Sequence, residues 1–270
     1  MSEIPPASPV PAPHRLAIRS DNPERLFDPL SGISYRDALH ALHRALAVDR
    51  YFEIGSRQGD SLARMRREAV AVCVDPAMRL KPDLLADKTE LHLYQQTSDA
   101  YFARHDPRTV LGGPIQLAFI DGLHHSDAVL RDFVNTERFC DPGGAIVLHD
   151  CLPWNDAMAQ RRGTTPDGAG VKGTGAWAGD VWRVLPVLAR RRPELRFTVL
   201  DCPPTGLVVI TGLDPSDRGL GRQLPAILAR LDAGPARPGQ LAAWLEGLEV
   251  ADSRAIAAAG QWQEAIGLAG

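Results

Sequence analysis

The sequence predicts an α/β fold built on a doubly wound, mostly parallel sheet. Two observations lead to this prediction. Short apolar strands alternate with helical segments from residue 50 to residue 149, and this alternation is typical of a parallel sheet with helices on both faces. The first strand of the series also ends in Glu53 and continues into a glycine turn, the arrangement by which α/β sheets bind nucleosides.

The elements before and within this alternating region are predicted from periodicity and turn residues. Apolar residues recur at helical spacing between Ser34 and Leu46, which predicts an amphipathic helix there. Strands are expected at 50–54, 69–75, 90–95, 115–121 and 144–149. Helices are expected near 59–67, 98–104 and 126–138.

The second half of the chain continues with a helix and a pair of strands. The helix is expected over 181–190, with a kink or interruption at Pro186. Strands follow near 195–201 and 206–211, separated by Pro203-Pro204-Thr205. Two strands joined by so short a connection are predicted to be antiparallel.

Composition changes along the chain suggest three regions. Residues 1–13 contain five prolines and are expected to form a disordered lead-in. The main domain is expected over 14–213, and a helical appendage over 214–270 with breaks at Gly234-Pro235 and Pro238-Gly239. The glycine-rich stretch 162–179 interrupts the main domain; a lid, a binding loop and a disordered segment all remain open for it.

Bulk properties exclude several classes of partner. The 270 residues carry a net charge of -3, which argues against a nucleic-acid partner. No apolar run approaches the ~20 residues that a membrane-spanning helix needs, and the N-terminal residues do not follow a signal-peptide pattern. The four cysteines are scattered, and Cys73 lies in an apolar strand. We therefore expect a cytoplasmic protein with reduced thiols, and a homo-oligomer remains open.

The glycine turn distinguishes two kinds of nucleoside ligand. Its pattern is Glu53-x-Gly55-x-x-x-Gly59, with Arg57 where a dinucleotide-binding turn has its middle glycine. This disfavours a nicotinamide oxidoreductase. A ligand without phosphates, bearing a sulfonium and an amino-acid end, suits the acid at the strand end better. Asp75 closes the next strand 22 residues after Glu53 and is expected to accept both ribose hydroxyls. An ordinary βα turn with a conformational glycine is the alternative.

Two further strands end in titratable residues. Asp121 and His124 follow strand 115–121, and His149 and Asp150 follow strand 144–149. Because parallel strands end at one edge of a sheet, we expect these residues in the same crevice as Glu53 and Asp75. The two aspartates suit a divalent cation, and a histidine suits the role of general base. The structural alternative is that Asp121 caps the next helix and His149 is a hydrogen-bonded histidine.

These motifs together resemble a known family. Glu53-x-Gly55-x-x-x-Gly59, Asp75, Asp121-Gly122-x-His124 and Gly143-Gly144 leading to His149-Asp150 are similar to class I S-adenosylmethionine-dependent methyltransferases. The branch with macrocin-type sugar O-methyltransferases and cephalosporin hydroxylase-like proteins is the most similar. The resemblance covers residues 48–152 and, more loosely, the strands near 195–211. It implies a Rossmann-like sheet of seven strands with the last antiparallel.

The resemblance also implies roles for individual residues. Gly55 and Gly59 would approach the methionine part of S-adenosylmethionine, and Asp75 its ribose. Ser98 and Asp99 would lie near the adenine. Metal-dependent relatives bind Mg²⁺ through an aspartate that matches Asp121 and an acidic pair that matches positions 149 and 150. This chain has His149 beside Asp150, a departure from the oxygen ligands that magnesium prefers. Asp121 thus belongs to both the expected cofactor site and the expected metal site.

The leading hypothesis is therefore an O-methyltransferase acting on a small hydroxylated acceptor. His124 is the first candidate for the base that takes the hydroxyl proton, and His149 is the second. Trp177 and Trp182 would wall the acceptor or belong to a surface loop. The alternative is a cofactor-binding module that acts through a protein partner without methyl transfer. Its support is a set of apolar stripes near the C-terminus, namely Leu224, Ile227, Leu228, Leu231, Leu241, Trp244 and Leu245.

Overall fold

A twisted sheet forms the centre of the protein. The computed structural model describes residues 10–22, 24–81, 83, 86–163, 177–232, 237 and 239–268. Within these residues, seven strands form one sheet in the order β4-β3-β2-β5-β6-β8-β7. The strands are β2 (Arg50–Ile54), β3 (Val70–Val74), β4 (Glu90–Tyr94), β5 (Ile115–Ile120), β6 (Cys140–His149), β7 (Arg196–Leu200) and β8 (Leu207–Thr211). Strand β8 is antiparallel to both of its neighbours, which confirms the predicted fold class and the antiparallel strand pair.

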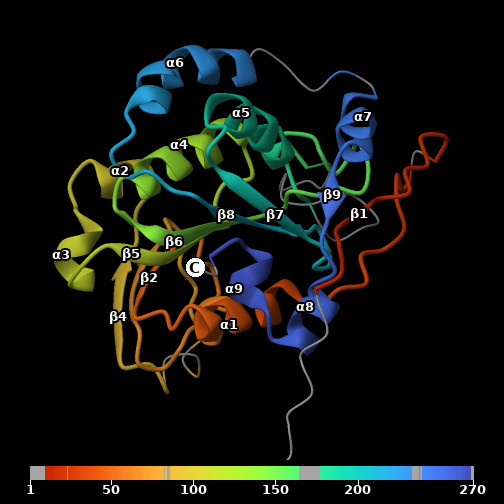
Figure 1. Cartoon of the computed structure of the whole chain (residues 1–270). Helices are drawn as coiled ribbons and strands as arrows, with labels where there is room; N and C mark the ends of the chain where they lie inside the picture. Colours follow the sequence, from red (N-terminus) through yellow and green to blue (C-terminus); the bar gives the residue numbers. More distant parts are fainter. Residues whose placement is uncertain are drawn as a thin grey trace, which may run out of the picture.

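Helices cover both faces of this sheet (Figure 1). One face carries α4 (Ser126–Glu137), α5 (Val184–Arg191) and α6 (Gly219–Asp232), and the other carries α1 (Tyr35–Ala45), α8 (Ser253–Ala259) and α9 (Trp262–Ala265). Side chains alternate accordingly, so Phe52 and Ile54 belong to one apolar core and Tyr51 to the other. The central strands are apolar on both sides because neither face meets water.

Helix α1 matches its prediction closely and brings two residues to the sheet edge. Ser34 caps the helix by accepting a hydrogen bond from the backbone N–H of Asp37, and Leu39 and Leu42 are buried. The first helical turn, which holds Tyr35 and Arg36, lies against the carboxyl ends of the strands, where both residues line a cavity.

The prediction of a helix over residues 59–67 is wrong. Among these residues the structure has only the 3₁₀ turn η1 (Leu62–Arg64). Two tertiary contacts explain the difference. The hydroxyl of Ser61 donates to Glu53 rather than capping a helix, and the ammonium of Lys88 donates to the carbonyl oxygens of Ala63 and Met65. These carbonyls thus have partners without a longer helix.

Other boundaries differ for local reasons. Pro186 lies in the first turn of α5 and does not interrupt it; the irregularity is the 3₁₀ turn η3 (Val181–Arg183) just before. A proline fits there because a first-turn residue has no intrahelical acceptor for an N–H. Strand β6 begins at Cys140 rather than residue 144, with a register shift against β5 between Ile115 and Leu117. Two short helices follow β4, namely α2 (Ser98–Phe102) and the unpredicted α3 (Pro107–Leu111).

The C-terminal segments pack on the main sheet layers. Helix α7 (Gln240–Glu246) leads to the unpredicted strand β9 (Glu249–Val250), which pairs antiparallel with β1 (His14–Arg15). Helices α8 and α9 contact α1. The predicted break at Gly234-Pro235, Pro238, and residues 1–9 of the lead-in lie outside the described residues. The predicted domain boundaries stay predictions.

The apolar stripes near the C-terminus belong to the protein core. Ile227, Leu231, Leu241 and Leu245 are buried, and the remaining three stripe residues pack against the same cluster. The stripes therefore do not form an exposed surface for a partner. None of the described helices is long and apolar enough to cross a membrane.

Candidate cofactor and cation site

The carboxyl ends of the parallel strands open onto a large cavity. It has a volume of about 1070 Å³, which is enough for a nucleoside cofactor together with a small second ligand. Eight of the residues predicted for the site line it, namely Gly55, Asp75, Ser98, Asp99, Asp121, His124, His149 and Asp150. The lining does not include Glu53 or Gly59. The topology thus brings most of the predicted site together at one edge of the sheet.

Glu53 lies beneath the cavity rather than in its wall. It is fully buried, accepting hydrogen bonds from the Tyr51 hydroxyl at 2.5 Å and from the Ser61 hydroxyl at 3.0 Å. Burial raises the pKa of this carboxyl, and the hydrogen bonds oppose the rise. Glu53 therefore ties β2 to the segment after the glycine turn and supports the cavity floor from below.

Gly55 is required by the packing of two strand ends. Its φ angle is +92°, and a Cβ atom there would lie 2.0 Å from the carbonyl oxygen of Asp121 and 2.7 Å from the Cα of Gly122. A side chain would thus push the end of β5 away from the end of β2. Gly59 also has a positive φ, +81°. The glycines shape the turn that carries Ser56, whose buried hydroxyl lines the cavity without a hydrogen-bond partner among the described residues.

Asp75 is pre-oriented at the end of β3. Its Oδ2 accepts a hydrogen bond from the backbone N–H of Arg57 at 2.7 Å, and its Oδ1 accepts one from that of Ala77 at 2.6 Å. The residue is only 7% exposed, and it lines the cavity. Because each carboxylate oxygen has a second lone pair, both can still accept ligand hydroxyls.

A third group of lining residues follows β4. Ser98 and Asp99 open helix α2, which Thr97 caps. Asp99 pairs with Arg131 of α4 at 3.4 Å. The sequence prediction missed Asp132, the next residue of α4, which is 3% exposed yet lines the cavity. Burial raises its pKa to about 7. No sequence signal marked Asp132, because a carboxylate in a helix is usually on the solvated face.

Two carboxylates and two imidazoles meet at the ends of β5 and β6. His124 Nε2 lies 3.4 Å from Asp121 Oδ1 and 3.2 Å from Asp150 Oδ2. His149 Nδ1 lies 3.3 Å from each of the same two oxygens. Ligand atoms of Asp121, His124 and Asp150 all lie within 4.8 Å of one another. Asp121 and Asp150 thus lie close together at the strand ends, as expected, and their sharing of one cation or one water stays a prediction. We call these four residues the Asp–His cluster.

Outer contacts fix the orientation of the cluster. Asp150 has a φ of +59°, and its Oδ1 accepts a hydrogen bond from the Thr205 hydroxyl at 2.5 Å. His124 Nδ1 lies 2.8 Å from the carbonyl oxygen of Trp177. A carbonyl only accepts, so Nδ1 carries a proton and Nε2 faces the carboxylates. Gly179 also packs on the His124 loop, where a Cβ would lie 1.8 Å from the His124 carbonyl oxygen.

The charges within the cluster control its protonation. Burial lowers the pKa of His124, but the charges of Asp150 and Asp121 outweigh burial and raise the pKa to about 9. Burial also lowers the pKa of His149, but the charges of Asp150 and Asp121 outweigh burial and raise this pKa well above its ordinary value. The imidazoles in turn lower the pKa of both carboxyls against the effect of burial. A pKa of about 9 lies above the neutral range expected for the His124 base.

Residues from outside the strand ends complete the wall beside the cluster. The Tyr35 ring lies 4.2 Å from the His149 ring. Arg36 donates to the Tyr35 hydroxyl at 3.1 Å and to Asp60 at 3.2 Å. Trp177 lines the cavity as predicted, with its ring 5.2 Å from that of His124. The prediction for Trp182 is wrong.

Trp182 belongs to the core. It is 1% exposed and packs against Trp244 at a ring distance of 5.4 Å. Of the glycine-rich stretch between residues 162 and 179, positions 164–176 lie outside the described residues.

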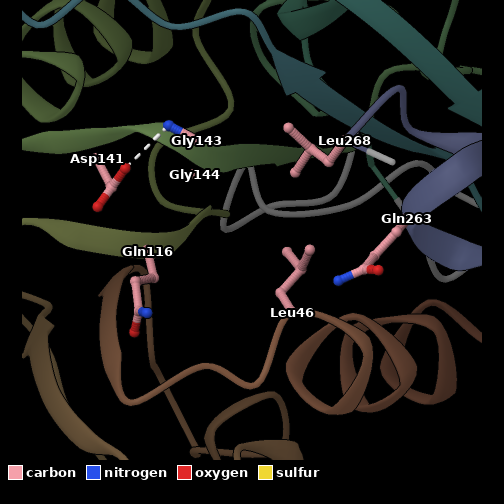
Figure 2. A pocket seen from close by; sticks show the side chains of 7 residues that line it. All are labelled: Leu46, Gln116, Asp141, Gly143, Gly144, Gln263 and Leu268. Carbon is pink, nitrogen blue, oxygen red and sulfur yellow. Dashed lines mark hydrogen bonds between the residues drawn. The ribbon is translucent and has the colours of Figure 1, made fainter. Parts of the chain in front are cut away.

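A second, smaller hollow of about 210 Å³ lies at the opposite edge of the sheet (Figure 2). Figure 2 shows Gln116 of β5 and Asp141 of β6 on one side of the hollow and Leu46, Gln263 and Leu268 on the other; the Gln116 side chain points away from Asp141. Asp141 is the only titratable residue in its described lining, and its Oδ1 accepts a hydrogen bond from the backbone N–H of Gly143 at 2.9 Å. This hollow lacks the combination of acids and histidines found in the large cavity.

Part of the chain matches the model of a known protein family. Residues 52–151 match the family model of a methyltransferase domain. Among solved structures, the chain is similar to the O-methyltransferase TomG of Streptomyces achromogenes in complex with SAM, at 18% identity and a TM-score of 0.44, over 66% of this chain and 78% of TomG. A putative caffeoyl-CoA O-methyltransferase of Staphylococcus aureus is similar at 13% identity and a TM-score of 0.46, over 65% and 81%.

A third similar structure is an O-methyltransferase of Bacillus cereus in complex with SAH, at 15% identity and a TM-score of 0.42, over 65% of this chain and 79% of that one. Similarities at this level do not identify a substrate. Residues 52–151 match a methyltransferase domain, and the order of the seven strands with the antiparallel β8 forms a Rossmann-like sheet.

Proposed function

We propose that the protein transfers the methyl group of S-adenosylmethionine to a hydroxyl of a small acceptor. The observation that carries this proposal is the position of the Asp–His cluster. It lines the same cavity as Asp75 and the turn at Gly55, so a cofactor held by the turn has its reacting end beside acids and imidazoles. Methyl transfer to oxygen needs such groups because the hydroxyl proton must leave.

The order of the strands supports one orientation of the cofactor. Along the sheet edge, Asp75 ends β3, Gly55 follows β2, and the cluster follows β5 and β6. The ribose would bind Asp75, and the adenine would lie toward Ser98 and Asp99. The methionine part would then lie over the glycine turn, with the sulfonium toward the cluster.

The wall around the cluster suggests the kind of acceptor. Tyr35, Leu123, Trp177 and Pro204 all line the cavity on this side. Leu123 is 55% exposed. In the described part of the chain, Leu93 is the other large apolar residue that is exposed. An exposed apolar side chain beside a polar cluster fits an acceptor with an apolar or aromatic face and a hydroxyl at its edge.

The reaction is a displacement at the methyl carbon. The acceptor oxygen attacks in line with the carbon–sulfur bond, that bond breaks, and the products are the methyl ether and S-adenosylhomocysteine. Most of the rate enhancement would come from positioning. His124 remains the first candidate for the proton acceptor, because its side chain is 23% exposed whereas that of His149 is 7% exposed. A raised pKa means that His124 must first release its own proton.

Magnesium does not fit the residues of the cluster. The four atoms that face one another are two carboxylate oxygens and two imidazole nitrogens. Magnesium favours a shell of oxygen ligands, so we assign no step of the reaction to it.

The test is an assay for methylated products. The protein is incubated with S-adenosylmethionine and a panel of phenols, catechols, sugars and hydroxy acids, and products are identified by mass spectrometry. Methylation of a hydroxyl is expected, and His124→Ala should abolish most of it, while His125→Ala on the same loop serves as control. If S-adenosylmethionine binds but no hydroxyl in the panel is methylated, the proposal loses its support.

A further inference from the structure

We propose that Asp132 recognises the adenine of S-adenosylmethionine as a neutral acid, and that cofactor binding therefore takes up a proton. The carboxyl would accept a hydrogen bond from the adenine amino group and donate one to the neighbouring ring nitrogen. The proposal rests on the proposed function for the identity of the ligand and for the end of the cavity that holds its adenine. Asp132 lies on helix α4, to which the resemblance to methyltransferases assigns no role.

Two contacts between elements place Asp132 at the adenine end of the cavity. Helix α4 packs against helix α2, and Ser98 and Asp99 at the start of α2 line the cavity together with Asp132. The carboxyl of Asp132 also lies close to the end of β5, because its Oδ2 would be 4.0 Å from a Cβ atom at Gly122. Gly122 is itself part of the lining. Asp132 therefore faces the space in which the adenine would lie.

Asp132 is buried in the cavity wall without a cation to pair with. It is only 3% exposed, although it lines the cavity. The adjacent cation, Arg131, is held by Asp99 at 3.4 Å and by Asp127 at 3.0 Å. None of the ion pairs between described residues includes Asp132. An ionised carboxylate that is buried without a cation is unfavourable, so this position favours the neutral acid.

The groups that face Asp132 leave this preference in place. Burial raises the pKa of Asp132, a side-chain hydrogen bond with Ser98 lowers it, and the charge of Asp99 on α2 raises it again. On its own helix, Arg131 lowers the pKa and Asp127 raises it. The resulting pKa is about 7, so roughly half of the molecules carry the neutral acid at pH 7 before any ligand binds.

A neutral carboxylic acid matches the edge of adenine, whereas a carboxylate does not. Adenine presents the N–H donors of N6 beside a ring nitrogen that accepts. A protonated carboxyl has one O–H donor and a carbonyl acceptor, and the side-chain amide of asparagine reads adenine with the same pair of groups. An ionised carboxylate can only accept, so it would leave the ring nitrogen opposite a second acceptor. The bound adenine thus favours the protonated form of Asp132.

This match links the affinity for the cofactor to pH. Below pH 7 the carboxyl of Asp132 is mostly protonated, and binding takes up little at this site. Above pH 7 the carboxyl must gain a proton when the cofactor binds, so the Kd rises by up to ~10-fold per pH unit. Asp132→Asn keeps a donor and an acceptor but cannot ionise, and it should therefore remove this part of the pH dependence.

Calorimetry with the full-length protein and S-adenosylmethionine tests the linkage. The Kd is measured at pH 6, 7 and 8 for the wild type, Asp132→Asn and Asp132→Leu, with Asp141→Asn at the opposite edge of the sheet as control. At pH 6 we expect Asp132→Asn to bind within ~3-fold of the wild type and Asp132→Leu to bind at least ~10-fold more weakly. Between pH 6 and pH 8 the ratio of the wild-type Kd to the Asp132→Asn Kd should rise by about 10-fold. The corresponding ratio for Asp141→Asn should stay constant.

Two further measurements separate Asp132 from other titrating groups. 5′-Methylthioadenosine lacks the amino-acid end of the cofactor, and the ratio of wild-type to Asp132→Asn Kd for this ligand should show the same rise with pH. The heat of binding at pH 7 in buffers of different ionisation enthalpy gives the number of protons taken up. This number should be greater for the wild type than for Asp132→Asn by about 0.5.

Either of two results would overturn the proposal. One is a Kd ratio between the wild type and Asp132→Asn that does not change with pH. The other is binding to Asp132→Asn that is as weak at pH 6 as binding to a folded Asp132→Leu. Urea unfolding without ligand shows whether each variant is folded, and if Asp132→Leu is not, the Asp132→Asn ratio decides alone.

The binding measurement and the methylation assay separate the two proposals. A Kd ratio that rises with pH, without any methylated hydroxyl, would retain the role of Asp132 and remove the proposed function. A methylated hydroxyl together with a Kd ratio independent of pH would remove the role of Asp132 and retain the proposed function.

Discussion

The hydroxyl of Thr205 donates to the carboxylate of Asp150 at 2.5 Å, although the two residues are 55 positions apart in the sequence. Thr205 is fully buried in the connection between β7 and β8, and Asp150 is 6% exposed at the end of β6. The antiparallel pairing of β6 with β8 brings them together. A residue in the connection between the last two strands thus orients a carboxylate of the Asp–His cluster.

We predict that Thr205→Val slows methyl transfer by about 10-fold and changes the KM for S-adenosylmethionine little, because the variant frees Asp150 but leaves the cofactor side intact. Steady-state kinetics with saturating cofactor measures both quantities. Thr109→Val, on helix α3 away from the cavity, is the matched control. A change confined to the KM for the cofactor would contradict the positioning role.

Asp75→Ala should weaken binding of S-adenosylmethionine. Loss of charge-assisted hydrogen bonds to the ribose is worth about 1.5–3 kcal/mol, which corresponds to a Kd about 10- to 150-fold higher. Isothermal calorimetry gives the value, and Asp141→Asn at the opposite edge of the sheet provides the control (Figure 2). Equal affinity in Asp75→Ala and the wild type would refute the ribose assignment.

Gly55→Ala should lower the free energy of unfolding more than Gly112→Ala does. Both Gly55 and Gly112 have positive φ angles, +92° and +72°, but only at Gly55 would a Cβ meet neighbouring backbone. The conformational penalty alone is about 1–2 kcal/mol, and overlap with Asp121 and Gly122 should add about 1–3 kcal/mol.

Urea unfolding of Gly55→Ala and Gly112→Ala separates these two contributions, because Gly112 has open space around it. Gly55→Val should be still less stable and should lose cofactor binding. Equal free energies of unfolding in the two alanine variants would show that the strand ends adjust without strain.

His43 should make the protein less stable in acid. Its ring is 1% exposed, and burial lowers its pKa from 6.5 to about 3. Between these values the unfolded chain binds one more proton than the folded chain. The free energy of unfolding contributed by His43 therefore falls as pH decreases from about 6.5 toward 3, by about 1 kcal/mol per pH unit.

Asp132 has a pKa raised to about 7, so its contribution to the free energy of unfolding has the opposite pH dependence. The contribution of His43 is therefore measured as the difference in stability between a His43 variant and the wild type. Urea unfolding of the wild type and of His43→Leu at pH 6.5, 5.5 and 4.5 gives the difference. We expect the advantage of His43→Leu to grow as the pH falls. His40→Leu, the exposed histidine of the same helix, should show no such trend, and parallel curves for His43→Leu and the wild type would contradict the prediction.

The sequence alone determined the sheet and the part of the site that strand ends supply. Apolar strands alternating with helices require a parallel sheet, and parallel strands end at one edge. For this reason Asp75, Asp121, His149 and Asp150 could be assigned to one crevice from their positions in the chain. The short connection at Pro203-Pro204-Thr205 likewise predicted the antiparallel pair.

Tertiary structure decided everything that depends on contacts between distant segments. The helix predicted over 59–67 is replaced by a 3₁₀ turn because Lys88 satisfies its carbonyls. Glu53 lies beneath the cavity rather than in its wall, with its carboxylate hydrogen-bonded to Tyr51 and Ser61. Both differences depend on side-chain hydrogen bonds, about which the periodicity of apolar residues contains no information.

The same limit applies to the residues that complete the site. Tyr35, Arg36, Asp132 and Thr205 reach the cavity or the cluster only through the docking of α1, α4 and the β7–β8 connection. The raised pKa of His124 follows from two carboxylates on different strands. The strand ends could be predicted because backbone topology alone brings them together, whereas the distances, charges and protonation of the cluster depend on how those helices and loops pack.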